Sequence, residues 1–312
     1  MFPVLFNLGP VAISSFGFFM AAAFLVAVFA IWRVTQVYGI DEEKTLDLIL
    51  LTFFGGVIGA RIYFVLLNLS YFNDISKVLL INRYPGLSFW GALLGGILAL
   101  GYFSARLRLN FWQMADFGAI GLLIGIVIGN IGCFLGGCEF GVVSNLPFAT
   151  GVAGLIGKRF PVSILESLIL LVVFYYLWKQ VLRFHFAGKI AALFLVLLGL
   201  TKFITEFYRG DAKQILAWVS YGHILSAVLV VLGLVVFYNQ SKRDFRSDLV
   251  AMVITPFDRR RRDLLLSKIR RSWYNFSINL KIKMGRLSRA LTTSPRKLKR
   301  KLNVKSTPTD FS

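Results

Sequence analysis

The feature that most constrains this chain is a series of long apolar runs. Each is about as long as the roughly 20 residues that an α-helix needs to cross the hydrocarbon core of a bilayer. The runs cover roughly residues 12–32, 46–68, 87–105, 113–135, 161–178, 188–206 and 219–238. A helix satisfies its own backbone hydrogen bonds, as lipid demands. The sequence therefore predicts an all-α membrane protein with about seven transmembrane helices.

The composition agrees with a membrane protein. Hydrophobic residues make up 57% of the chain and charged residues only 16%, against about 25% charged in soluble domains. The first ten residues contain no Lys or Arg, so they lack the basic region of a cleavable signal peptide. We therefore expect the first span to be retained.

The predicted domain division falls at about residue 240. The tail, residues 241–312, holds 20 of the 35 Lys and Arg but only 5 of the 15 Asp and Glu. Within it, apolar residues recur at three- and four-residue steps near 264–291, which is typical of an amphipathic helix. Such a basic helix could lie on an anionic membrane surface, or the tail could be a poorly ordered solubilising segment. The basic excess belongs to the tail and does not indicate nucleic-acid binding by residues 1–240.

The basic residues set the predicted orientation. Lys242, Arg243 and Arg246 directly follow the last run, and the positive-inside rule places them in the cytoplasm. Seven spans then place the N-terminus outside. Basic residues in the shorter loops are nearly balanced between the two sides, so the segment after the last span decides.

Polar residues gather at one depth in this arrangement. Ionisable groups inside a bilayer are costly and usually functional. Several lie in the outer parts of their spans, at positions far apart in sequence: Arg61, Ser88, Asn130, Cys133, Glu166, Lys202, Glu206, Arg209 and His223. We expect a shared polar site that opens to the outer leaflet, although each residue could instead only mark the end of a span. His185 falls on the other side and is expected to be a loop residue.

The stretch Gly129–Gly141, GNIGCFLGGCEFG, ends the fourth run. It contains five Gly and the only two Cys of the chain, Cys133 and Cys138. We expect free, partly buried thiols, with a disulfide as the alternative. Two Cys with no nearby partner make a poor ligand set, so no metal or cofactor is expected.

Seven segments in order resemble the prolipoprotein diacylglyceryl transferases of bacteria. The stretch Gly129–Gly141 resembles the family signature, and the match extends through about residue 240. The other segments are LGPVAISSFG (8–17), GGVIGARIYFVL (55–66), PGLSFWGALLGG (85–96), PVSILE (161–166), KFITEFYRGD (202–211) and SYGHILS (220–226). The resemblance implies a multi-pass enzyme of the bacterial cytoplasmic (inner) membrane. Its substrates would be phosphatidylglycerol and a prolipoprotein signal peptide with a lipobox Cys, which would become a diacylglyceryl thioether.

The resemblance also implies roles for particular residues. Catalysis is expected of Glu206 and Arg209, and also of His223, although the family has Gln at that position. Binding of the lipid phosphate and head group is expected of Arg61, Ser88, Asn130, Cys133, Gly141 and Lys202. Structural support is expected of Phe16, Trp90 and Glu166.

The chain departs from the family pattern at several of these positions. Phe16 replaces a Tyr, Trp90 a His, Asn130 an Arg, and Lys202 an Arg. Arg61, Lys202 and Arg209 could supply the cation that Asn130 lacks, and His223 could act as the base. A homologue with altered chemistry that binds an anionic lipid is therefore a second hypothesis. A small transporter is a third, but it would need polar residues at both depths, and the inner halves of the runs hold almost none.

Overall fold

The computed structural model describes residues 4–8, 11–69, 71–72, 77, 84, 86–152, 156–211, 214–216, 219–241, 245 and 267. The chain divides into two units, Met1–Lys242 and Arg243–Ser312. Only Phe245 and Ser267 are described in the second unit, so the predicted amphipathic helix near 264–291 lies outside the described residues, apart from Ser267. All that follows concerns the first unit.

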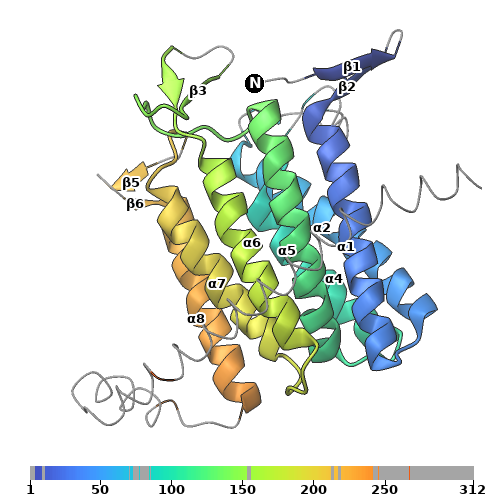
Figure 1. Cartoon of the computed structure of the whole chain (residues 1–312). Coiled ribbons are helices and arrows are strands. Elements are labelled where there is room, and N and C mark those ends of the chain that lie inside the picture. The colour runs from blue at the N-terminus through green and yellow to red at the C-terminus, as the bar shows by residue number, and fades with distance from the viewer. Residues whose placement is uncertain are drawn as a thin grey trace, which may run out of the picture. The chain divides into compact units, whose positions relative to one another are not determined.

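Seven long helices make up the described part of this unit (Figure 1). They are α1 (Ser15–Tyr38), α2 (Glu42–Leu67), α4 (Phe89–Arg106), α5 (Phe111–Gly136), α6 (Val162–Val181), α7 (Lys189–Glu206) and α8 (Tyr221–Ser241). They confirm the positions of the seven predicted runs. Six are long and apolar enough to span a membrane. The exception is α7, whose 18 residues include the charged Lys189, Lys202 and Glu206.

Short antiparallel strand pairs lie between or before the helices. They are β1 (Val4–Leu8) with β2 (Val11–Ser14), β3 (Thr150–Gly151) with β4 (Lys158–Arg159), and β5 (Gln214–Leu216) with β6 (Val219–Ser220). We call the end of the unit drawn at the top of Figure 1 the upper end. There α5 and α7 end, and α6 and α8 begin. The opposite, lower end holds the connection between α6 and α7. Which end faces the cytoplasm stays a prediction.

Local sequence explains where helices begin and end. The backbone N–H of Gly17 donates to Oγ of Ser14 before α1, and that of Gln113 donates to Oδ1 of Asn110 before α5. Such side-chain acceptors satisfy the free N–H groups of a first helical turn. Gly39 and Gly137 follow α1 and α5 with positive φ, the left-handed conformation that ends a helix and that glycine adopts without strain.

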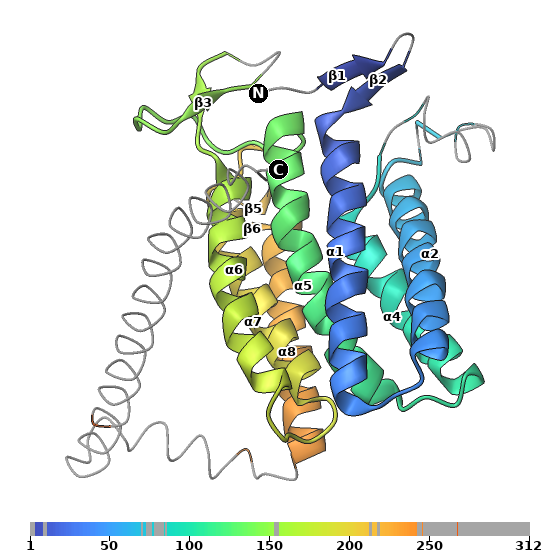
Figure 2. The ribbon, with the colours of Figure 1, turned by 45° about the vertical axis from the view of Figure 1, so that its right-hand side comes forward.

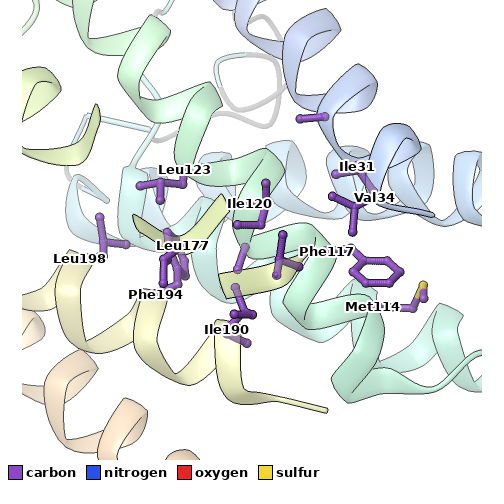
Figure 3. Close-up of a cluster of buried hydrophobic side chains, with 14 of the residues drawn as sticks. Ile31, Val34, Met114, Phe117, Ile120, Leu123, Leu177, Ile190, Phe194 and Leu198 are labelled. Atoms are coloured by element: carbon purple, nitrogen blue, oxygen red, sulfur yellow. The ribbon is translucent and has the colours of Figure 1, made fainter. Parts of the chain in front are cut away.

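The closest helix pairs include both neighbours in sequence and helices that lie far apart in it. The closest pairs are α2 with α4, α1 with α5, and α7 with α8, and α5 also contacts α4, α6 and α7. Figure 2 shows α1 and α5 between the α2–α4 pair and the group of α6, α7 and α8. The apolar core lies where α1, α5, α6 and α7 meet, and Figure 3 shows part of it.

Glycine allows the closest of these contacts. A Cβ on Gly95 of α4 would lie 2.5 Å from the carbonyl oxygen of Gly55 and 2.8 Å from Cα of Gly59, both on α2. The two backbones therefore touch, as in other small-residue contacts between membrane helices. Beside this contact an apolar groove of about 340 Å³ runs between α2 and α4, lined by exposed side chains such as Ile58 and Leu98.

Candidate functional site

A buried ion pair joins α6 to α7 near the upper end. Nζ of Lys202 lies 2.8 Å from Oε1 and 3.1 Å from Oε2 of Glu166, and the two side chains are 8% and 2% exposed. The amide nitrogen of Asn130, on α5, donates to Oε1 of Glu166 at 3.1 Å. Nζ of Lys202 also lies 4.6 Å from the centre of the Phe89 ring, at the start of α4. Four helices thus meet around one carboxylate and one ammonium group.

A second charged group centres on Arg209, just after α7. Its guanidinium donates to Asp211 through two nitrogens, at 3.1 and 2.9 Å. Nη1 lies 3.5 Å from Oε2 of Glu206 and 3.7 Å from Oε1 of Glu139. The Arg209 side chain is 22% exposed, so the guanidinium is partly accessible from the upper end. Three carboxylates therefore surround one cation.

Charge balance governs ionisation in this group. Burial works against ionisation of Glu139, but the nearby charges of Lys202 and Arg209 outweigh it and hold the pKa of this carboxyl below its usual range. Burial likewise works against the charge of Arg209, but Glu139, Asp211 and Glu206 raise its pKa above the ordinary value. Both groups therefore stay charged at neutral pH.

The stretch Gly129–Gly141 reaches Arg209 through the backbone. The chain pairs with the segment after α7 through an isolated antiparallel bridge between Gly141 and Arg209. The N–H of Gly210 donates to the carbonyl of Phe140 at 2.9 Å. A Cβ on Gly210 would lie 2.5 Å from the carbonyl oxygen of Gly141, so a side chain there would separate the two segments. Glycine thus allows the approach that brings Glu139 to Arg209.

The prediction of free thiols is wrong in this structure. Cys133 and Cys138 form a disulfide across the end of α5. After Gly136 the chain turns back, and the N–H groups of Gly137 and Cys138 both donate to the carbonyl of Cys133, at 2.8 and 3.2 Å. This turn brings the two sulfur atoms together, which the separation of five residues alone did not indicate.

Ser220 connects Glu206 to His223 at the start of α8. Its hydroxyl donates to Oε1 of Glu206 at 2.7 Å and lies 3.0 Å from Nδ1 of His223. Its backbone N–H donates to the same Nδ1 at 3.2 Å. An added Cβ on Gly222 would collide with the Glu206 carboxylate, so this position keeps space for the acid. Arg209, Glu206, Ser220 and His223 thus form one continuous chain of contacts.

Several buried polar atoms close to these groups lack a hydrogen-bond partner within the described part of the chain. They are Oε2 of Glu139, Oγ1 of Thr150, Nε of Arg159, Oγ of Ser163 and Nε2 of His223. All belong to the loops or helix starts at the upper end. Because unpartnered buried polar groups are costly and uncommon, their concentration among the described residues makes the upper end a candidate place for a polar ligand or water.

The structure does not bring every predicted site residue into this cluster. The guanidinium of Arg61 donates to the backbone carbonyls of Lys77, Tyr84 and Gly86, at 2.8 to 3.0 Å. These contacts hold the connection between α2 and α4. Arg61 therefore contacts this connection, and its predicted role at the lipid phosphate stays a prediction.

Three further predicted residues occupy helix starts. Ser88 directly precedes α4, and Trp90 packs against the apolar core. Phe16 lies in the first turn of α1, 38% exposed and packed against Gly136. The structural role predicted for Trp90 and Phe16 and the head-group role predicted for Ser88 stay predictions.

The lower end holds a polar cluster that the sequence analysis missed. Asp116 of α5 is 1% exposed, and its carboxylate accepts the backbone N–H groups of Gly188 and Ala191, at 2.8 and 2.7 Å. Nε2 of His185 lies 3.4 Å from the same carboxylate. His185 lies in a loop, as expected, yet it is one half of an ion pair. The view that the inner halves of the runs hold almost no ionisable groups therefore needs this correction.

Sequence reasoning also missed Glu139, Ser220 and Asp211 at the upper end. Glu139 and Asp211 lie in connections outside the apolar runs, and Ser220 lies at the very start of the last run, where a polar residue is ordinary. One signal could have found Glu139. It is the only acidic residue in the glycine-rich stretch 129–141.

Comparisons with known proteins identify the family of this chain. Residues 3–239 match the family described as "Prolipoprotein diacylglyceryl transferase". The chain is 30% identical over 210 residues to the phosphatidylglycerol–prolipoprotein diacylglyceryl transferase of Clostridioides difficile (strain 630), which covers 67% of this chain and 84% of the relative.

Two further relatives with the same name give similar figures. That of Idiomarina loihiensis is 33% identical over 213 residues, 66% of this chain and 80% of the relative. That of Photobacterium profundum is 31% identical over 226 residues, 68% of this chain and 82% of the relative. The family match spans all seven helices of the first unit. This chain therefore belongs to the prolipoprotein diacylglyceryl transferase family.

Proposed function

We propose that this chain transfers the diacylglyceryl group of phosphatidylglycerol to the lipobox Cys thiol of a prolipoprotein. The relatives carry this activity in their names. The observation that carries the proposal is the upper-end cluster. It combines partly accessible Arg209, the carboxylates around it, and buried polar atoms without partners among the described residues. The proposed location is a bacterial cytoplasmic membrane, with the upper end facing outward.

The reaction sets clear chemical requirements. The thiol sulfur forms a bond to a glycerol carbon of the lipid, and the bond from that carbon to a phosphate oxygen breaks. The electron pair of the broken bond leaves with glycerol phosphate, and the thiol proton passes to a base. A cation must stabilise the leaving phosphate, and a base must help ionise a thiol with an ordinary pKa of about 8.5.

Arg209 is the proposed phosphate ligand. Its guanidinium is fixed by Asp211 through two hydrogen bonds and by Glu206, so it is held in place before any lipid arrives. The contact with Glu139, at 3.7 Å, is the longest of the three. An arriving phosphate would therefore replace Glu139 first.

Glu139 is a proposed base in this arrangement, whereas the sequence analysis offered His223 for that role. Arg209 and Lys202 keep the pKa of Glu139 low, which makes the carboxylate a weak base while no lipid is bound. A phosphate bound to Arg209 adds negative charge beside Glu139, and a like charge raises the pKa of a carboxyl group. Lipid binding would thus turn Glu139 into a better acceptor for the thiol proton.

Lys202 and Asn130 are proposed to support the phosphate site without contacting the phosphate. Asn130 stands where the family has Arg, and its amide donates to Glu166. Lys202 supplies the positive charge in the same layer, paired with Glu166. We propose that this layer supports α7 and contributes to the positive potential beneath the phosphate.

Binding of an anionic lipid without transfer is the second candidate function. It is favoured by one observation, namely that Lys202 and Arg209 are already paired with carboxylates. These carboxylates reduce the net positive charge that is available to stabilise a leaving phosphate, on which the transfer step depends.

Complementation tests the first candidate. The full chain is expressed in a bacterium depleted of its own transferase, and growth and lipid modification of a reporter lipoprotein are measured. Wild type should rescue growth, and Arg209→Gln should not. Arg183→Gln, in the exposed loop at the lower end, is the matched control and should rescue normally. Failure of the wild-type chain to modify the reporter despite normal membrane insertion would overturn the transfer hypothesis.

A further inference from the structure

His223 lies buried at the start of α8, against the upper end of α7. The residue is 5% exposed. Its ring packs edge-on against Phe203 and Phe207, with ring centres 5.1 and 4.3 Å away. Phe207 is itself 49% exposed. The imidazole is therefore enclosed, but it packs against a side chain that reaches the surface.

The hydrogen bonds of His223 assign its proton. Nδ1 accepts the backbone N–H of Ser220, at 3.2 Å, and therefore carries a lone pair and no hydrogen. A neutral imidazole has one protonated nitrogen, so the proton lies on Nε2. The lone pair that a general base needs is thus already in use. His223 in this state is a hydrogen-bond donor.

The orientation of this donor is coupled to the charged cluster. The Ser220 hydroxyl donates to Glu206, and Glu206 contacts Arg209. Ser220 therefore acts as a positioning residue that holds the imidazole in fixed relation to the guanidinium. Glu206 and Ser220 thus link Arg209 to His223, so a molecule bound to Arg209 by its phosphate would lie at the same end of α7 and α8 as His223.

The donor itself has no acceptor in the part of the chain that the structure describes. Nε2 of His223 is among the buried polar atoms without a hydrogen-bond partner. Buried polar groups are nearly always paired in folded proteins, and an exception calls for an explanation. A ligand oxygen that arrives with the lipid supplies one.

We propose that His223 is a headgroup-selectivity residue whose Nε2–H donates to a terminal glycerol hydroxyl oxygen of phosphatidylglycerol. The inference rests on the proposed function, because it takes the lipid from there. A neutral donor suits an uncharged hydroxyl oxygen, whereas the charged Arg209 suits the phosphate. A site that hydrogen-bonds a hydroxyl group discriminates strongly against an analogue that lacks it. His223 therefore favours phosphatidylglycerol over phosphatidate, which has the phosphate but no terminal glycerol.

The test compares two lipids with four forms of the full-length protein. Wild type, His223→Leu, His223→Gln and His185→Leu are purified in phosphatidylcholine micelles or vesicles. Phosphatidylglycerol or phosphatidate is added, and the rise of the unfolding temperature is followed against the mole fraction of added lipid. Glycerol phosphate release in the presence of a lipobox peptide is measured in parallel, with its pH profile. His185→Leu is the matched control, since it changes the only other His, at the lower end.

His223→Leu is expected to raise the half-saturating fraction of phosphatidylglycerol roughly tenfold and to leave that of phosphatidate unchanged. His223→Gln, which retains an N–H donor, should stay within about threefold of wild type and keep the pH profile of release. His185→Leu should leave the preference between the two lipids intact.

Two outcomes overturn the inference. One is an unchanged preference for phosphatidylglycerol in His223→Leu, which would leave His223 a packing residue against Phe207. The other is a His223→Gln form that binds lipid normally but releases no glycerol phosphate, which would make His223 a base. If the wild type binds phosphatidylglycerol selectively through His223 but releases nothing, the proposed transfer fails and the selectivity role stands.

Discussion

The two ends of the helical unit each bury carboxylates, but the hydrogen-bond partners of the buried polar groups differ between the ends. At the lower end, the Asp116 carboxylate has a partner at both oxygens, and these partners are the first N–H groups of α7 and the ring of His185. At the upper end, Glu166 and Glu206 are also fully bonded, yet neighbouring atoms such as Oε2 of Glu139 and Nε2 of His223 are left without partners in the described residues.

The lower end therefore supports the fold, whereas the upper end is the proposed place of ligand recognition. The lower cluster completes a helix start, because Asp116 caps α7 from a different helix. Its hydrogen bonds are closed within the protein. The upper cluster also contains donors and acceptors that have no partner among the described residues. The comparison predicts that changes at the lower end alter stability, whereas changes at the upper end alter activity as well.

The largest expected effect comes from Glu166→Gln. It leaves the Lys202 ammonium buried without a counter-charge, and breaking a buried ion pair costs about 3–5 kcal/mol of unfolding free energy. Thermal unfolding of the purified protein measures this loss. Glu166→Gln combined with Lys202→Met should recover much of the stability without restoring rescue. A single variant as stable as wild type would show that the pair is not buried as described.

Gly222→Ala should have the next largest effect. The added methyl group collides with the Glu206 carboxylate, and such overpacking typically costs about 1–3 kcal/mol. Displaced Glu206 would release both Ser220 and Arg209, so rescue should fail even at temperatures where the variant is folded. Gly118→Ala in α5 is the control, because its Cβ would enter open space. Equal rescue by the two variants would contradict a role for the Glu206 position.

Asp116→Asn should be milder and should spare activity. After this substitution the amide oxygen can still accept one backbone N–H at the start of α7. The amide NH2 group would then face the second backbone N–H, which is also a donor. The expected loss is about 1 kcal/mol, typical of a damaged helix cap. Thermal unfolding and rescue below the melting temperature check it. Loss of rescue in a well-folded Asp116→Asn variant would contradict the proposal that only the upper end affects activity directly.

The smallest expected effect concerns pH. The stability that each end contributes should change with pH in opposite directions. A hydrogen bond to Asp116 raises the pKa of His185 against the cost of burial and the nearby charge of Lys189. Stability from this pair is complete below the unfolded pKa of about 6.5 and decreases as pH rises through the raised pKa. Tyr38, which also contacts His185, stays uncharged over this range.

Glu139 shows the reverse dependence. Its lowered pKa stabilises the fold above the unfolded value of about 4.3, and this stabilisation is lost as pH falls through the folded value. Melting temperatures from acidic to alkaline pH test both ends. His185→Gln should flatten the alkaline side of the curve and Glu139→Gln the acidic side. A variant that flattens the wrong side would refute the assignment.

The helices could be predicted closely because a bilayer leaves few choices. The run predicted at 113–135 became α5 (Phe111–Gly136), and that predicted at 188–206 became α7 (Lys189–Glu206). The gathering of Glu166, Lys202 and Glu206 at one end also followed from counting residues along each run. The depth of a residue along a membrane helix depends only on its position within the run.

The contacts within the site could not be obtained in that way. Whether Arg61 faces the cluster or the loop beside it depends on how α2 rotates against α4, and the glycine contact between these helices decides this. The partners of Arg209 lie in connections whose paths depend on tertiary packing. The disulfide likewise depends on the turn after α5, and no residue count along a helix describes that turn.

The capping of α7 by Asp116 has a consequence for how this protein can change over time. The helix is anchored at Gly188 and Ala191, and it presents Lys202 and Glu206 at its other end. Each residue of an α-helix turns the chain by about 100°. One inserted or deleted residue between the anchor and the ion pair would turn both side chains away from Glu166 and Ser220. The segment can therefore tolerate substitutions, but its length must stay constant to keep Lys202 and Glu206 facing their partners.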